Sequence, residues 1–189
     1  MPEQLVTRAL LARTVNYGES DRVCTLLTED HGKLSAIAKS ARRSRRRFGG
    51  ALSVFVLGRA TLLPRIRSDM LMLEGFDSLE DLGPGISADV VKMAHGSYML
   101  EVVRELWPEG QAEPVLFRTL WQALKVLCFN PPARVLLRAF ELQVLSLSGF
   151  LPSLERCVSC GGHLDTGALG FNVNEGGLVC SRCGPHGWP

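Results

Sequence analysis

The sequence predicts a multidomain α+β protein with a small amino-terminal β-barrel, an all-α domain and a cysteine-rich metal-binding module. Three observations support this fold class. The first 76 residues contain five β-leaning segments separated by turn residues, the middle of the chain is apolar with helical periodicity, and two Cys-x-x-Cys pairs follow. We place the three domains at residues 1–80, 86–152 and 153–189.

The five β-leaning segments are short, apolar-rich and bounded by Gly, Asn, Asp or Pro. Gly58 is a plausible bulge or bend in the fourth segment, and Pro64 should end it. Five strands that carry a basic loop suit a closed barrel of the oligonucleotide-binding (OB) type, although the pattern leaves other five-stranded barrels open. The strands are expected at residues 5–15, 23–28, 34–38, 51–63 and 70–76.

Three helices are expected in the middle of the chain, separated by proline-containing breaks. Ser87 can cap the first helix, with Asp89 in its first turn, and the helix runs to Leu106. It is apolar nearly all round, so we expect it to be buried. The second helix begins at Pro114, and the third covers about residues 133–147. Four large side chains are expected in the helical core: Tyr98, Met99, Trp121 and Phe140.

Four of the six cysteines, Cys157, Cys160, Cys180 and Cys183, form the two Cys-x-x-Cys pairs. Each pair can present two sulfur atoms from one tight turn, which gives the four ligands of a tetrahedral Zn²⁺. We therefore predict one structural zinc. The segment between the pairs is rich in glycine and polar residues and could form only a β-hairpin, so metal binding would supply its organisation.

The other cysteines and the nearby histidines are not needed for the metal site, and a disulfide framework is not favoured. A disulfide framework is improbable because the amino terminus lacks the layout of a signal peptide. Cys24 and Cys128 stand alone in apolar segments and are interpreted as buried, inert thiols. His163 and His186 each follow a second cysteine by three residues and are reserve ligands that a complete Cys₄ site leaves unused.

A basic loop lies between the third and fourth predicted strands. Its arginines are locally uncompensated, because the nearest carboxylates in the sequence are Asp30 and Asp69. Arginine is weakly hydrated and binds phosphate oxygens bidentately, so a cluster of this kind favours phosphate contact over a solvated charged face. The residues expected to contact nucleic acid are Lys39, Arg42, Arg43, Arg45, Arg46 and Arg47.

The net charge of +2 is distributed unevenly along the sequence. Residues 1–68 contain 13 Lys and Arg against 5 Asp and Glu, a net charge of +8, whereas residues 69–125 contain 4 against 10, a net charge of −6. The basic front is the candidate for nucleic-acid binding. No apolar run approaches the ~20 residues of a membrane span, so we expect no membrane contact and a cytoplasmic, nucleoid-associated protein.

Motifs of common enzyme classes are missing from the sequence. It has no phosphate-binding Gly-Lys-Ser/Thr loop and no serine or cysteine in a nucleophile elbow, and its four histidines are scattered among unrelated segments. We therefore expect a binding protein rather than an enzyme.

Several short motifs, taken in order, resemble the RecO family of bacterial recombination mediators, and the resemblance spans nearly the whole chain. It implies an amino-terminal OB-fold, a helical domain and a zinc-binding module. The motifs are Tyr17-Gly18-Glu19-Ser20-Asp21, Gly32-Lys33-Leu34, Ala38-Lys39-Ser40-Ala41-Arg42-Arg43, Phe140-Glu141-Leu142, Gly149-Phe150-Leu151-Pro152 and Cys157-Val158-Ser159-Cys160-Gly161.

The resemblance also implies a function in recombinational repair. Family members bind single- and double-stranded DNA, anneal complementary strands covered by single-strand-binding protein (SSB), and work with RecR so that RecA can load. Lys39, Arg42 and Arg43 match the family's basic loop, whereas the other three arginines rest on the charge argument. Family members usually continue with further helix after the second cysteine pair, so we expect an incomplete or smaller helical domain here.

Two interpretations stay open at this point. The rival function is an RNA- or ribosome-associated OB-fold and zinc-ribbon module. For the acidic tail of SSB we favour the third helix, where Arg134 and Arg138 lie four residues apart on one face. Pairing of Arg138 with Glu141 is an equally good explanation of that arginine.

Overall fold

The structure is a computed structural model, and it describes residues 4–48, 52–66, 68–164 and 170–184. Contacts between residues divide the chain into two compact units, Met1–Phe140 and Glu141–Pro189. The first unit contains the predicted barrel and the helices that follow it up to residue 140. The second contains the rest of the last helix, a two-stranded sheet and the two cysteine pairs.

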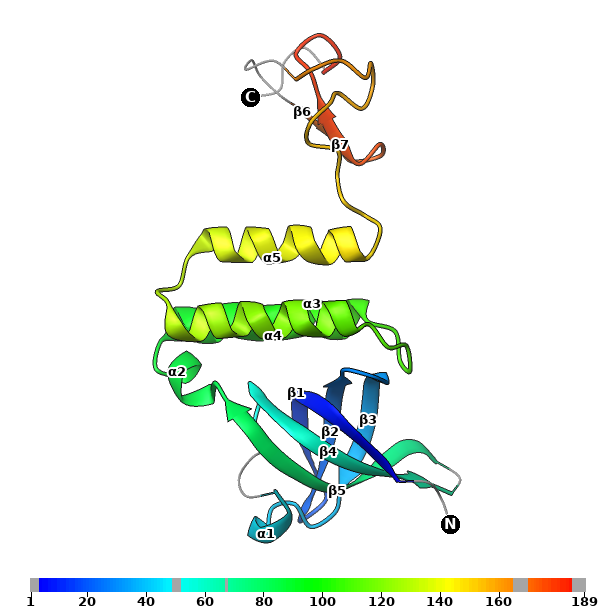
Figure 1. Cartoon of the computed structure of the whole chain (residues 1–189), viewed down its shortest axis with the longest axis vertical. Coiled ribbons are helices and arrows are strands. Elements are labelled where there is room, and N and C mark those ends of the chain that lie inside the picture. The colour runs from blue at the N-terminus through cyan, green and yellow to red at the C-terminus, as the bar shows by residue number, and fades with distance from the viewer. Residues whose placement is uncertain (1–3, 49–51, 67, 165–169, 185–189) are drawn as a thin grey trace. The chain divides into compact units, whose positions relative to one another are not determined.

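The first unit is built on a closed five-stranded barrel (Figure 1). The strands follow one another around the barrel in the order β1-β2-β3-β5-β4. β3 and β5 pair in parallel, and the other neighbours pair antiparallel. This arrangement is OB-like and confirms the predicted fold class. The strands are β1 (Leu5–Tyr17), β2 (Asp21–Thr28), β3 (Gly32–Ala38), β4 (Val56–Arg65) and β5 (Ser68–Asp81).

Alternate side chains of each strand fill the barrel interior. On β2, for example, Cys24 and Leu26 are fully buried members of the core cluster. Gly58 on β4 leaves room for an aromatic ring, because a Cβ at this position would lie 2.5 Å from Cε1 of Phe76. The register between β4 and β5 also shifts between Leu57 and Gly58, so the predicted bulge at Gly58 is confirmed.

The strand ends differ from the sequence prediction. β4 begins at Val56 rather than at residue 51, because the chain turns at Phe55, whose φ is 69° and whose side chain is buried. Pro64 does not end β4 but lies inside it, where the register with β5 shifts and a missing N–H is tolerated. β5 is longer at both ends than expected. Part of the basic loop forms a single helical turn, α1 (Arg45–Phe48).

Four further helices follow the barrel: α2 (Gly83–Ser87), α3 (Val90–Leu106), α4 (Pro114–Phe129) and α5 (Arg134–Leu147). Pro114 opens α4, as predicted. The predicted cap at Ser87 is wrong, because Ser87 ends the short helix α2. The N-cap of α3 is Asp89, whose Oδ1 accepts hydrogen bonds from the N–H groups of Val91 (2.7 Å) and Lys92 (3.1 Å). A carboxylate at this position satisfies two N–H groups that the helix leaves free.

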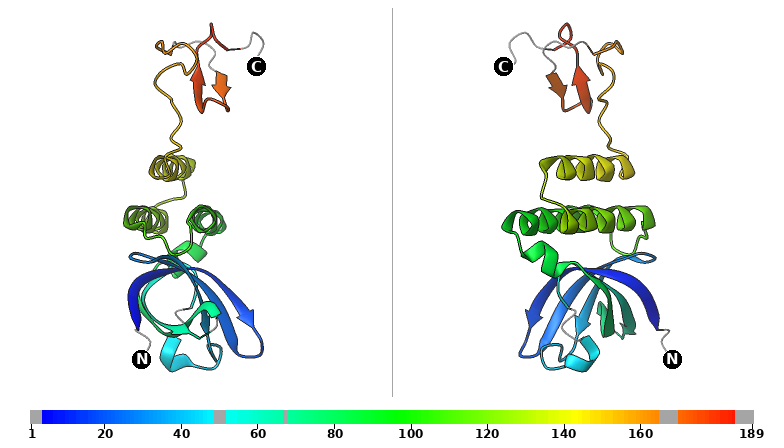
Figure 2. Two further views of the ribbon diagram at one scale, coloured as in Figure 1. Left: turned by 90° about the vertical axis from the view of Figure 1, so that its right-hand side faces the viewer. Right: turned by 60° about the vertical axis from the view of Figure 1, so that its left-hand side comes forward.

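α3 and α4 lie side by side on the end of the barrel opposite α1 (Figures 1 and 2). Gly96 lets α3 approach the barrel closely, since a Cβ there would lie 2.8 Å from the ring of Phe55. The expectation that α3 is buried all round is wrong: only one face is covered, and Val90 is 82% exposed. Of the four side chains expected in the core, Tyr98 is exposed, and three are buried, namely Met99, Trp121 and Phe140.

The second unit contains the β-hairpin that the sequence predicts between the cysteine pairs. Its strands are β6 (Gly170–Asn172) and β7 (Gly177–Val179), which pair antiparallel. The backbone of Ser153 lies beside β7, donating to the carbonyl of Gly176 (3.0 Å) and accepting from the N–H of Leu178 (2.9 Å). The hairpin is therefore tied to the segment that leads into the first cysteine pair.

None of the described helices is both long enough and apolar enough to cross a membrane.

Candidate nucleic-acid interface and metal centre

The basic loop joins β3 to α1 and rests on the turn between β1 and β2. Ser40 has a φ of 53°, and its N–H donates a hydrogen bond to Oδ1 of Asp21 at 2.8 Å. The N–H of Arg42 donates to the carbonyl oxygen of Ser20 at 3.0 Å. Two segments that lie about twenty residues apart in the sequence are thus joined at one end of the barrel, and the first supports the second.

Lys39, Arg42 and Arg43 are exposed on this loop. The guanidinium of Arg42 donates through Nη1 to the carbonyl oxygen of Glu19 at 3.1 Å, which orients it without neutralising its charge. In the described part of the chain, none of the three cations forms an ion pair. Their charge is therefore available to an anionic partner.

Arg47, which the sequence predicts to contact nucleic acid, also makes contacts within the loop. Its Nη2 donates to the carbonyl oxygen of Lys39 at 2.6 Å, and its Nε donates to Oγ of Ser44 at 3.2 Å. Its guanidinium carbon also lies 5.1 Å from the ring centroid of Phe48, within the range of a cation–π contact. Arg47 therefore closes the loop on itself, although it keeps its positive charge.

The remaining two predicted cations, Arg45 and Arg46, lie on α1, and their side chains are outside the described part of the chain. Phe48, the last residue of α1, is 3% exposed and belongs to the barrel core. It anchors the helical turn and is not available to stack on a base. Tyr17, the other aromatic residue near the loop, is 59% exposed at the end of β1.

Two arginines of β1 lie outside the loop. Arg8 forms an ion pair with Glu29, with 3.0 Å between Nη1 and Oε2. Arg13 is exposed after the register shift in β1. Arg8 is a weaker candidate for a phosphate contact, because its charge is already paired with that of Glu29.

The four paired cysteines gather in the second unit as the spacing predicts. Their sulfur atoms all lie within 4.8 Å of one another, and Sγ of Cys160 and Sγ of Cys180 are 3.9 Å apart. Tetrahedral zinc with Zn–S bonds of about 2.3 Å would separate its sulfur ligands by about 3.8 Å. Cys157 and Cys180 are buried, whereas Cys160 and Cys183 are exposed. The four cysteines could therefore hold one metal ion.

Each pair sits on a tight turn closed by backbone hydrogen bonds. The N–H of Gly161 donates to the carbonyl oxygen of Cys157 at 2.8 Å, and the N–H of Cys183 donates to that of Cys180 at 3.0 Å. A hydrogen bond from the backbone of Cys180 lowers the pKa of Cys157 to about 6, and one from the backbone of Cys183 lowers the pKa of Cys180. Both effects favour the thiolate, which is the form that binds a metal.

Cys183 behaves in the opposite way, because hydrogen bonding with the side chain of Cys160 raises its pKa to about 12. Four thiolates this close to one another repel, and this repulsion opposes the loss of the Cys183 proton. His163 is not part of the cluster, and His186 lies outside the described residues.

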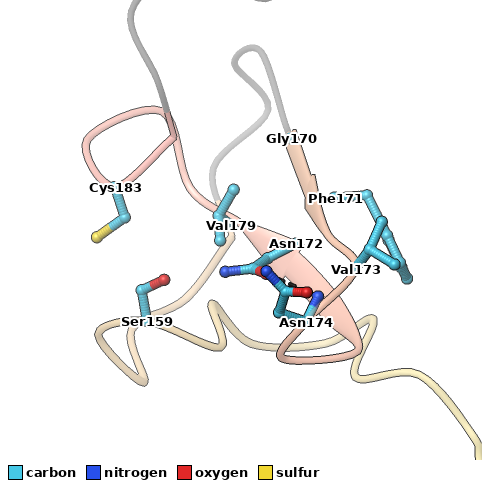
Figure 3. A pocket seen from close by; sticks show the side chains of 8 residues that line it. All are labelled: Ser159, Gly170, Phe171, Asn172, Val173, Asn174, Val179 and Cys183. Carbon is cyan, nitrogen blue, oxygen red and sulfur yellow. Dashed lines mark hydrogen bonds between the residues drawn. The ribbon is translucent and has the colours of Figure 1, made fainter.

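A cavity of about 340 Å³ lies beside the cysteine cluster (Figure 3). The polar side chains around it are used inside the hairpin: Oδ1 of Asn172 accepts from the N–H groups of Asn174 (3.0 Å) and Glu175 (3.2 Å), and Oγ of Ser159 donates to Glu175 (3.3 Å). These bonds shape the turn, so we assign no ligand to the cavity. It is lined by Ser159, Gly170, Phe171, Asn172, Val173, Asn174, Val179 and Cys183.

Comparison with known proteins identifies the family. The family model described as "Recombination protein O N terminal" matches residues 1–79, and the one described as "Recombination protein O C terminal" matches residues 87–187. None of the matched descriptions states a catalytic activity.

Curated relatives named "DNA repair protein RecO" agree with these matches. One from Anaeromyxobacter sp. (strain Fw109-5) is 42% identical over 100% of this chain and 74% of its own length. One from Anaeromyxobacter sp. (strain K) is 42% identical over 93% of this chain and 69% of its own length, and one from Pelobacter propionicus is 38% identical over 98% and 74%. The chain therefore belongs to the RecO family of DNA repair and recombination proteins.

Proposed function

We propose that the protein is a non-enzymatic recombination mediator that binds single- and double-stranded DNA through its basic loop and anneals complementary strands. One observation carries this proposal. Lys39, Arg42 and Arg43 are exposed on a loop that is held by the carboxylate of Asp21 and by backbone carbonyl groups, and they form no ion pair in the described part of the chain. A fixed cluster of unpaired cations is suited to phosphate oxygens.

The mechanism that we infer is electrostatic. Two DNA strands repel each other through their phosphates, and cations that neutralise both backbones allow the strands to stay close. A guanidinium that binds a phosphate makes no contact with the edges of the bases, so the protein would bind DNA of any sequence. Base pairing between the two strands would decide which strands anneal. Arg45 and Arg46 are proposed to add to this site because α1 places them on the same turn as Arg47.

We also propose that Cys157, Cys160, Cys180 and Cys183 hold one structural Zn²⁺. The proximity of their sulfur atoms and the turns that present them support this assignment. The ion would stabilise the second unit, whose hairpin strands have only three residues each. It would not take part in DNA binding.

Partner binding forms the rest of the proposal. The chain would act with RecR to let RecA load, and it would bind the acidic tail of SSB. Arg134 and Arg138 are exposed on α5 and are our candidates for the tail contact. A labelled tail peptide titrated against Arg134→Ala and Arg138→Ala variants tests this assignment. Equal affinity for folded variants and wild type would place the tail elsewhere.

Mixing the protein with two complementary DNA strands tests the function itself. We expect duplex formation to be faster with the protein than without it, at protein concentrations that saturate the strands. The RNA-associated alternative predicts retention on RNA and no acceleration of DNA annealing. A double-stranded product that forms at the spontaneous rate would reject the mediator function.

A further inference from the structure

A second cavity, of about 230 Å³, opens beside the basic loop. Its volume equals that of roughly seven or eight water molecules in the liquid, which is enough for a phosphate group with its bridging waters. None of the described residues that line it carries a carboxylate. The lining residues are Arg22, Ala41, Arg42, Ser44, Phe48, Leu52 and Ser53.

Arg22 is the unusual member of this lining. It pairs in register with Ala38, a buried residue of the barrel core, so its side chain starts on the interior face of β2 at the end of the barrel. The same face carries Cys24, and the charge of Arg22 reaches it: burial raises the pKa of the Cys24 thiol to about 11, and Arg22 opposes that rise. A cation therefore lies at the edge of an apolar interior.

The hydrogen bonds of Arg22 leave its charge uncompensated. Its Nη1 donates to the carbonyl oxygen of Leu52 at 3.1 Å, while its Nε is enclosed and has no hydrogen-bond partner among the described residues. Arg22 also forms no ion pair within the described part of the chain. An enclosed N–H group without an acceptor is unfavourable, and a ligand oxygen in the cavity would become its acceptor once the side chain of Arg22 shifts towards the cavity.

Arg42 is a second cationic residue in the lining of the same cavity. It is held by the carbonyl oxygen of Glu19, just as Arg22 is held by that of Leu52, so both groups are oriented by neutral acceptors and keep their full charge. The buried side chains of Phe48 and Leu52 form an apolar part of the wall, which lowers the local dielectric constant and strengthens attraction to an anion. The hydroxyl of Ser44 adds a polar group to the lining.

We propose that this cavity binds one internucleotide phosphate of single-stranded DNA, with Arg22 as the inner contact and Arg42 as the outer one. The inference rests on the proposed function, because the DNA strand that lies on the basic loop would supply the phosphate. The cavity would add a partly enclosed phosphate contact, at the end of the barrel, to a site otherwise made of exposed cations. This contact would fix the position of the DNA backbone on the protein.

The salt dependence of binding to an oligothymidylate tests this contact. Loss of one phosphate contact flattens the slope of log K against log salt by about 0.7 for a single strand. We expect this change for Arg22→Gln, which removes the charge. Arg22→Lys keeps the charge and should keep the slope, but it should bind more weakly because a lysine cannot form the planar fork of a guanidinium. Arg118→Gln is the matched control: it removes the same charge from an exposed position on α4. Its slope should equal that of wild type.

The outcomes separate the two proposals. Wild-type protein that fails to bind the oligonucleotide contradicts the proposed function. Wild-type protein that binds, together with an Arg22→Gln variant of equal slope and affinity, overturns the phosphate cavity alone. A terminal phosphate is a different source of the same group, so the titration is repeated with a 5′-phosphorylated oligonucleotide. A requirement for that end group would overturn the internucleotide assignment.

A second measurement needs no substitution and so remains decisive if the Arg22 variants do not fold. The Nε–H resonance of Arg22 is followed by NMR during titration of the wild-type protein. We expect it to move with the oligothymidylate and not with the same oligomer carrying uncharged methylphosphonate linkages. No movement with the charged oligomer would overturn the proposal. Movement only with an acidic peptide would also overturn it, by assigning the cavity to a carboxylate.

Discussion

Oδ1 of Asp21 accepts a hydrogen bond from the N–H of Ser40 at 2.8 Å, so a carboxylate at the start of β2 fixes the backbone of the basic loop. Ser40 has a positive φ, a conformation that costs energy for a residue with a side chain. The acid therefore stabilises a strained turn among the cations. It is a positioning residue for the interface rather than a competitor for its charges.

The hydrogen bond between Asp21 and Ser40 predicts a change in DNA affinity opposite to the change expected from charge alone. Asp21→Ala removes a negative charge near the loop, which alone would strengthen DNA binding. We expect it to weaken binding roughly fivefold, because loss of the hydrogen bond destabilises the loop by about 1 kcal/mol. Asp21→Asn keeps an oxygen acceptor and should restore affinity. Fluorescence anisotropy with a labelled oligonucleotide measures all three proteins.

Glu19→Ala is the control for Asp21. The structure uses the backbone carbonyl of Glu19 to hold Arg42, and the substitution leaves that carbonyl in place while removing one negative charge. We expect unchanged or slightly tighter binding. Tighter binding by Asp21→Ala, matching that of Glu19→Ala, would show that Asp21 acts only through its charge.

Arg43 and Arg47 should respond differently to replacement by alanine. Arg43 is exposed on the loop, so Arg43→Ala should flatten the single-strand salt slope by about 0.7 and leave the melting temperature unchanged. Arg47→Ala should also lower the melting temperature, because it removes the bonds to Lys39 and Ser44. Salt titrations and thermal melts of both variants check this difference. Two variants with the same melting temperature would argue against the closing role of Arg47.

Purified protein should contain about one zinc per chain, measured by elemental analysis. Removal of the metal by a chelator should unfold the second unit, since its short hairpin cannot bury enough surface alone. Cys157→Ser should have the same effect. Cys128→Ser, which changes a cysteine outside the cluster, should retain the metal. Metal-free protein that melts at the same temperature as untreated protein would contradict the zinc assignment.

Gly96→Ala tests the close packing of α3 against Phe55 at the end of the barrel. Alanine usually stabilises a helix relative to glycine by about 1 kcal/mol. Here the added Cβ would lie 2.8 Å from the ring of Phe55, so we expect destabilisation of about 1–3 kcal/mol instead. Ser97→Ala, at the exposed neighbouring position, is the control and should be neutral or stabilising. Urea denaturation of both variants gives the comparison. A Gly96→Ala protein more stable than wild type would mean that Phe55 can move away.

The parts that the sequence predicts well are those fixed by local rules. The spacing of Cys157 and Cys160 places two sulfur atoms on one turn whatever surrounds it, and the hairpin between the pairs follows from its composition. Strand periodicity likewise predicts the OB-like barrel. A glycine inside a strand pattern indicates a bulge or a close approach, and at Gly58 both are found.

The parts that it predicts poorly depend on contacts between distant segments. α1 is stabilised by Phe48, which packs in the barrel core. The local sequence contains no helix signal that predicts this contact. The contacts of Arg47 within the loop follow from the position of the Lys39 carbonyl. Arg22 lies at the cavity only because β2 begins at this end of the barrel. A run of arginines in the sequence does not distinguish cations that bind a ligand from those that hold the loop.

Annealing of SSB-covered complementary DNA strands, followed by fluorescence energy transfer between end labels, tests the central claim most directly. The account predicts that wild-type protein accelerates annealing and that a Lys39→Ala, Arg42→Ala, Arg43→Ala triple variant, with its zinc retained and its melting temperature unchanged, does not. A triple variant that anneals as fast as wild type would contradict the account, because the exposed cations of the basic loop would then not carry the activity.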